Sequence, residues 1–101
     1  MPYLQGYTTV NANSGNFKQL RSTSMVTDFG TCPNTSIYVG AGANITLQID
    51  SNASGTVTTY QSTILTGNPA GWIPIGQIDP SRVWIRGTAA STCDVTWHCI
   101  W

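Results

Sequence analysis

The sequence predicts an all-β domain, built as an antiparallel β-sandwich, a jelly-roll-like fold or a small barrel of about seven to nine short strands. Runs rich in β-branched and aromatic residues recur at intervals of roughly 8 to 12 residues, separated by Gly, Pro, Asn and Asp. No window shows the apolar periodicity of an amphipathic helix. Thr is abundant, and its branched side chain favours strands. At 101 residues the chain has the length of one domain.

The first part of the chain contains three predicted strand regions. Residues 1–10 are expected to form an N-terminal arm or an edge strand over Tyr3–Val10, and residues 11–101 a single β-domain. After a loop at NANSG, Phe17–Phe29 holds one long strand or two short ones, and Ser36–Ala41 holds another. Internal repeats are missing, which argues against a propeller or a solenoid.

The clearest strand pattern lies near the middle of the chain. Ile45, Leu47 and Ile49 alternate with polar residues, as in a half-buried strand. Five further elements follow: a hairpin loop at Ser51–Gly55, a strand at Thr56–Thr66, an edge strand or irregular crossing at Trp72–Ile78, a β-turn at Asp79–Arg82, and a terminal hairpin of Val83–Thr88 and Cys93–Trp101. The edge position follows from Pro74, which cannot donate to a ladder.

The terminal segment Cys93–Trp101 combines the residue types of metal and redox sites. On a strand, one face carries Cys93, Val95, Trp97, Cys99 and Trp101, and the other carries Asp94, Thr96, His98 and Ile100. Cys93 and Cys99 would lie roughly 20 Å apart, too far for a disulfide. Because His98 and Cys99 point to opposite faces, the spacing argues against zinc. We predict a core strand without a metal site; a bridge from Cys32 to Cys93 or Cys99 stays open.

The charge of the chain is unusually low. Only 8% of the residues are charged, and the formal net charge is zero. A neutral chain has no electrostatic attraction for nucleic acid or for an anionic membrane, so neither partner is predicted. No stretch approaches the ~18 consecutive apolar residues of a membrane span, and MPYLQGYTTV lacks the pattern of a signal peptide. A nearly uncharged surface favours a protein that functions within an assembly.

The residue inventory does not form a catalytic motif. His98 is the only histidine, and the chain lacks a Gly-x-Ser-x-Gly nucleophile motif, a phosphate loop and a dinucleotide-binding fingerprint. A glycosidase needs two carboxylates, whereas Asp50 and Asp79 border turns, where Asp usually bonds its own backbone. We predict a protein that is not an enzyme, with no catalytic residue, no cofactor and no metal.

Exposed aromatic residues are the candidate contacts with a partner. Tyr3 and Tyr7 share one face of the N-terminal segment, and Trp84 shares a strand face with Arg86. Trp, Tyr and Arg are enriched in interface hot spots. We predict partner contacts at these four residues, with the alternative that Arg86 only covers a half-buried Trp84.

The C-terminal part of the chain resembles a known class of protein. VWIRGT at Val83–Thr88, the short loop that follows and CDVTWH at Cys93–His98 look like the terminal hairpin of small structural proteins of tailed bacteriophages. Within that class the chain is most similar to head decoration, or cement, proteins. The resemblance implies a virion protein, made in the host cytoplasm, that binds the capsid surface and clamps the major capsid protein or another virion protein. It also implies a homo-oligomer, with a trimer favoured, and contacts from the N-terminal arm.

Two other functions fit the same residues. A small lectin-like carbohydrate-binding module would use Tyr60, Trp72 and Trp84 as sugar-stacking residues, although the sequence contains no repeated sugar-binding unit and no acidic calcium cluster. The third hypothesis is a phage tail or fibre component, because the sequence does not distinguish such a protein from a head protein.

Overall fold

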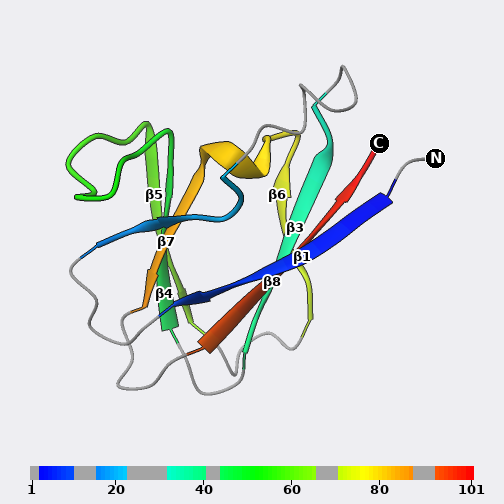
Figure 1. Cartoon of the computed structure of the whole chain (residues 1–101), viewed down its shortest axis with the longest axis horizontal. Coiled ribbons are helices and arrows are strands. Elements are labelled where there is room, and N and C mark those ends of the chain that lie inside the picture. Colours follow the sequence, from blue (N-terminus) through cyan, green and yellow to red (C-terminus); the bar gives the residue numbers. More distant parts are fainter. Residues whose placement is uncertain (1–2, 11–15, 23–31, 41–43, 66–70, 88–92) are drawn as a thin grey trace.

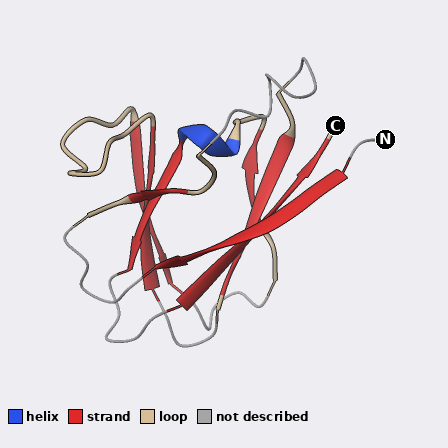
Figure 2. Cartoon of the chain, in the orientation of Figure 1, coloured by secondary structure: helices blue, strands red, loops and turns tan. Residues whose placement is uncertain are grey.

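The chain folds into eight β-strands and one short 3-10 helix within the residues that the computed structural model describes, namely 3–10, 16–22, 32–40, 44–65, 71–87 and 93–101. In chain order the elements are β1 (Tyr3–Val10), β2 (Lys18–Gln19), β3 (Asn34–Val39), β4 (Asn44–Ile49), β5 (Tyr60–Leu65), β6 (Ile73–Gly76), η1 (Pro80–Arg82), β7 (Val83–Gly87) and β8 (Cys93–Ile100). Figures 1 and 2 show that strands make up both layers of the molecule. The predicted all-β class is confirmed.

The strands form two four-stranded antiparallel sheets that face each other (Figure 1). Sheet A has the order β1-β8-β3-β6, and sheet B has the order β2-β7-β4-β5. The order pairs the first strand with the last, the second with the seventh, the third with the sixth and the fourth with the fifth. This nesting is that of a long hairpin rolled into two layers, which is the jelly-roll topology.

The core lies between the two sheets and is almost entirely aliphatic. Alternate residues of the strands point into it because successive side chains of a strand point to opposite faces. The buried core residues are Leu20, Ile37, Val39, Ile45, Leu47, Ile49, Val83, Ile85, Val95, Trp97 and Cys99. The alternation predicted for the terminal segment is confirmed: Val95, Trp97 and Cys99 are buried, while Asp94 and Ile100 are exposed.

The predicted terminal hairpin is wrong. β7 pairs with β2 and β4 in sheet B, whereas β8 pairs with β1 and β3 in sheet A. Each of the two strands has one apolar face, and a jelly roll buries these faces against each other across the core. Alternation predicts such a face equally well for a hairpin and for two opposed sheets, so the pattern alone did not distinguish them.

Three other elements differ from their predicted form. The strand expected at Thr56–Thr66 begins only at Tyr60, and the strand region expected at Phe17–Phe29 contains Lys18–Gln19, with residues 23–29 outside the described part. The turn at Asp79–Arg82 is a 3-10 helix. The Asp79 carboxylate accepts a hydrogen bond from the Ser81 N–H at 2.9 Å, which caps this helix.

The connection between β4 and β5 folds over the outer face of sheet B. The N–H of Phe17 donates to the Ala53 carbonyl at 2.7 Å, and the Phe17 ring is buried beneath this loop. Gly55 has a φ of 70°, and a Cβ there would overlap the Phe17 ring. The guanidinium of Arg86 also lies over that ring, 4.5 Å from its centroid. These contacts form a second, smaller cluster outside the main core.

The two long sides of the sandwich are closed differently. On the side of β1 and β2, the Thr8 hydroxyl donates to the Leu20 carbonyl at 2.8 Å and Lys18 Nζ donates to the Thr9 carbonyl at 3.1 Å. On the opposite side, β6 is the terminal strand of sheet A and β5 is the terminal strand of sheet B, and the two strands do not pair with each other. A groove opens between these two strands.

Candidate binding surfaces

The outer face of sheet A carries a row of aromatic rings, most of them exposed, which we call the aromatic face. The rings span the whole width of the sheet. Tyr3 and Tyr7 belong to β1, His98 to β8 and Tyr38 to β3, and Trp72 immediately precedes β6. Tyr7 is 69% exposed, Tyr3 53%, Trp72 43% and Tyr38 41%. Large aromatic side chains left in water at such a density are a feature of interaction surfaces.

Four of these rings contact one another in a continuous chain across the sheet. The indole of Trp72 stacks on the imidazole of His98, with centroids 4.1 Å apart and an interplanar angle of 24°. The Tyr38 ring meets the Trp72 ring edge-on at 5.9 Å. The Tyr3 ring lies 5.8 Å from His98 on its other side. Mutual packing restricts the rotamers of these rings, so little side-chain entropy remains to be lost on binding.

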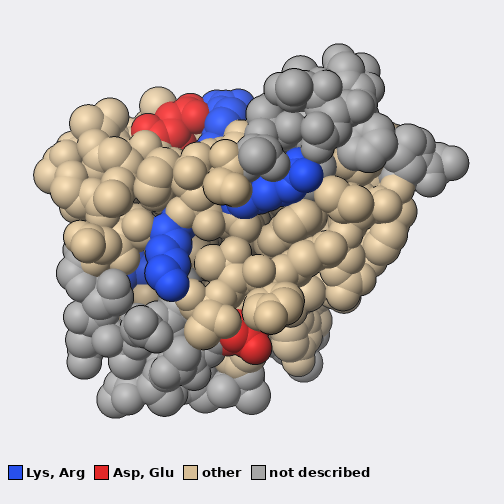
Figure 3. Space-filling view, in the orientation of Figure 1, with Lys and Arg blue, Asp and Glu red and all other residues tan. Residues whose placement is uncertain are grey.

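The polar groups of the aromatic face are almost all uncharged. Strand register places Gln5 and Ser36 on either side of His98, and the Tyr3 hydroxyl donates to Gln5 Oε1 at 2.7 Å. Asp94 is the single charged side chain on this face among the described strands, and its Oδ1 accepts from the Thr9 hydroxyl at 2.6 Å. The space-filling view shows few charged side chains on the side of the molecule that it displays, and an acidic and a basic group lie next to each other at its top (Figure 3).

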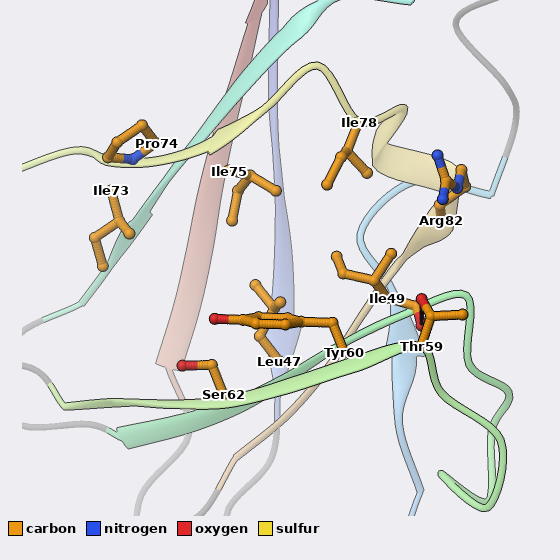
Figure 4. Close-up of a pocket in the computed structure, with 10 residues that line it drawn as sticks. All are labelled: Leu47, Ile49, Thr59, Tyr60, Ser62, Ile73, Pro74, Ile75, Ile78 and Arg82. Carbon is orange, nitrogen blue, oxygen red and sulfur yellow. Dashed lines mark hydrogen bonds between the residues drawn. The ribbon is translucent and has the colours of Figure 1, made fainter.

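The groove between β5 and β6 is the second candidate surface. Its volume is about 480 Å³, within the size range of ligand sites. Figure 4 shows the residues that line it, which are Leu47, Ile49, Thr59, Tyr60, Ser62, Ile73, Pro74, Ile75, Ile78 and Arg82. Tyr60 and Ser62 project from β5 toward the isoleucines of the opposite wall. The lining is mainly aliphatic, with two hydroxyls and one phenol.

The single charged group in the lining of the groove is neutralised by an ion pair. Arg82 donates through Nε and one Nη to the two carboxylate oxygens of Asp50, each at 2.6 Å. The bonds from Arg82 hold the pKa of the Asp50 carboxyl below its usual value. Because both side chains are partly exposed, such a pair contributes about 0–1 kcal/mol to stability. The groove therefore presents little net charge to a ligand.

The structure divides the four predicted partner contacts between two surfaces. Tyr3 and Tyr7 lie on the aromatic face, whereas Trp84 and Arg86 lie on the outer face of sheet B. Trp84 is half-buried, and the Arg86 guanidinium is engaged with the Phe17 ring. These four residues therefore do not form one patch.

The three predicted sugar-stacking residues are also separated. Trp72 belongs to the aromatic face, Tyr60 lines the groove, and Trp84 lies on the outer face of sheet B. The sequence reasoning did not select Tyr38 or His98 as contacts. Tyr38 alternates with the buried Ile37 and Val39, which signals an outward ring, but only the register between strands brings it to Trp72.

Neither Cys32 nor Cys99 belongs to the aromatic face or to the lining of the groove. Cys99 is fully buried, its thiol lies 3.5 Å from the Thr35 hydroxyl, and burial raises the pKa of this thiol. Cys32 and Cys99 are not joined in a disulfide, and the side chain of Cys93 is outside the described residues. Among the residues that the structure describes, no three His, Cys or Asp side chains gather in a way that could hold a metal ion.

The described residues contain no helix of the length and apolarity that crossing a membrane requires. No family model, curated protein or solved structure matches this chain.

Proposed function

We propose that this protein is a non-enzymatic structural protein that attaches through its aromatic face to the protein lattice of a virion, as a head decoration protein. The observation that carries the proposal is the row of mutually packed rings, most of them exposed, across sheet A. Jelly rolls are common among viral structural proteins and also among lectins, so the fold supports this class by analogy only.

The chemistry of the aromatic face fits a protein partner. Tyr and Trp bury large areas at low entropic cost, and they supply most of the free energy of binding where they are packed at the centre of an interface. The proposed partner is the major capsid protein or another virion protein with a complementary uncharged patch. A homo-oligomer, a trimer in the simplest case, would multiply weak contacts over a symmetric lattice and give high avidity.

The test is binding of the purified protein to capsids that lack it. We expect wild-type protein to bind in a saturable way, and Trp72→Ala to weaken binding by about 10- to 30-fold because it removes the ring that joins His98 and Tyr38. Val57→Ala is the control, because Val57 is 59% exposed but lies on the loop over the other sheet. Equal binding by the two variants, or no binding by folded wild-type protein, would contradict the proposal.

A carbohydrate-binding module is the second candidate, favoured by one specific observation. The Trp72 ring lies beside Tyr38, and the adjacent outward positions carry hydroxyl and amide groups at Ser36, Gln5 and Thr96. An apolar ring surface flanked by neutral hydrogen-bonding groups is suited to a sugar. A glycan array probed with the protein tests this candidate, and binding that Trp72→Ala abolishes would favour it over the capsid reading. A tail or fibre location would appear as binding to purified tails in place of heads.

A further inference from the structure

We infer that the groove between β5 and β6 accepts an extended, uncharged segment of a partner polypeptide, which adds to sheet B as a strand on the free edge of β5. Aliphatic side chains at alternate positions of that segment would enter the groove. This binding mode does not depend on the aromatic face, so it stands or falls separately from the proposed function.

The first argument is the free backbone edge of β5. β5 is the last strand of sheet B, and among the described residues no other strand pairs with its outer side. An edge strand leaves a row of unpaired N–H and C=O groups that can bond a further strand. The N–H of Tyr60 already donates to the Thr58 hydroxyl at 3.1 Å, so the receptive stretch is the rest of β5.

The backbone edge on the opposite wall of the groove is less suited to pairing with an added strand. β6 is the terminal strand of sheet A, but it is short and contains Pro74, which has no N–H to donate. Proline is one of the features that protect an edge from pairing. The two walls therefore have different roles: β5 offers hydrogen bonds, and β6 offers apolar surface.

The second argument is the side-chain chemistry of the groove. Leu47, Ile49, Ile73, Ile75 and Ile78 present aliphatic surface, and Ser62 and Tyr60 project from β5 toward it (Figure 4). Thr63, the neighbour of Ser62 on β5, is exposed on the other side of the strand. An added strand would continue this alternation, with apolar side chains facing the groove and polar side chains facing water.

The lack of unpaired charge in the groove limits which partner segments could bind there. Arg82 is the only charged residue in the lining, and it is paired with Asp50. A charged side chain entering the groove would lose its hydration without gaining a free counter-ion. The segment is therefore expected to be uncharged where it faces the groove.

The experiment uses a capped synthetic peptide about as long as β5, with alternating Ile and Thr, titrated into the full chain and followed by backbone amide chemical shifts. We expect saturable shifts concentrated in β5. A matched peptide with the same side chains, N-methylated on the edge that would face β5, should bind at least tenfold more weakly because it cannot donate to the strand. Equal affinity for the two peptides would show simple apolar contact and would overturn the inference.

Two variants of β5 locate the site. Ser62→Lys places a charge in the groove and should weaken peptide binding by at least tenfold, whereas Thr63→Lys places the same charge on the other side of the strand and should change it by less than about threefold. Thermal melting checks that both variants remain folded. Loss of binding in both or in neither would overturn the inference, as would a wild-type protein that self-associates through β5 but binds no peptide.

Discussion

The indole ring of Trp97 leaves no room for a side chain at Gly6. Gly6 pairs with Trp97 across β1 and β8, and a Cβ at Gly6 would lie 2.5 Å from Cζ2 of the Trp97 indole. Trp97 is 6% exposed and belongs to the core, so it has little room to move. We expect Gly6→Ala to destabilise the protein by about 1–3 kcal/mol through overpacking, measured by urea denaturation.

A double-variant cycle distinguishes overpacking from a general intolerance of β1. Trp97→Phe removes the part of the ring nearest to Gly6 and should itself destabilise the core. In the Gly6→Ala/Trp97→Phe double variant, the loss should be smaller than the sum of the two single losses. Additive losses would show that the indole is not the cause.

Cys99 links the stability of the core to pH. Burial raises the pKa of its thiol above the ordinary value of 9.0. Because the pKa is higher in the folded state, the thiol ionises at a lower pH in the unfolded chain. The contribution of Cys99 to the free energy of unfolding is therefore fully present below pH 9 and is lost as the pH rises toward the folded-state pKa. We expect wild-type stability to fall more steeply than that of Cys99→Ala between about pH 8 and pH 10. Parallel slopes in denaturation measured over this range would contradict the prediction.

The connection between β4 and β5 makes contacts that the sequence did not predict. Phe17 is 4% exposed, yet it lies outside the main core and is covered by this connection and by Arg86. We expect Phe17→Ala to destabilise the protein by about 3 kcal/mol and to speed hydrogen exchange of the Gly55 amide, which donates to Asn52 O. Val57→Ala, on the exposed part of the loop, should change stability by less than about 0.5 kcal/mol. A small effect of Phe17→Ala would show that the loop does not depend on this ring.

Individual strands were more predictable than their pairing. β1 begins and ends at the predicted residues, and the alternation of Ile45, Leu47 and Ile49 identified β4, because period-two burial is a local property. The partner of β7 was predicted wrongly because pairing depends on contacts between distant residues. A short connection between two amphipathic strands fits both a hairpin and a crossing between sheets.

At the scale of the whole molecule, the order and register of the strands bring together the residues of the aromatic face. Tyr3, Tyr38, Trp72 and His98 are widely spaced in the sequence, and their contact depends on the order β1-β8-β3-β6. The sequence placed Tyr3 and Tyr7 on one face and Trp72 among the candidate sugar-stacking residues, but it did not predict that these residues share a surface. β6 borders both surfaces, since Trp72 precedes it on the aromatic face and Ile75 faces the groove. One partner bound around β6 could contact both.

The nested pairing of strands also has a consequence for how the protein is made on the ribosome. β8 lies between β1 and β3 in sheet A, so β1 has no strand partner in its sheet, and β3 has only β6, until β8 has been synthesised. The β4–β5 hairpin and the β3–β6 pair can form early, but sheet A cannot be completed, and β1 cannot join it, before β8 is available. We expect folding to be a single late event, on the order of milliseconds to seconds, as in other β-proteins rich in long-range pairings. Until then, β1 remains an unpaired, uncharged strand that a chaperone could protect.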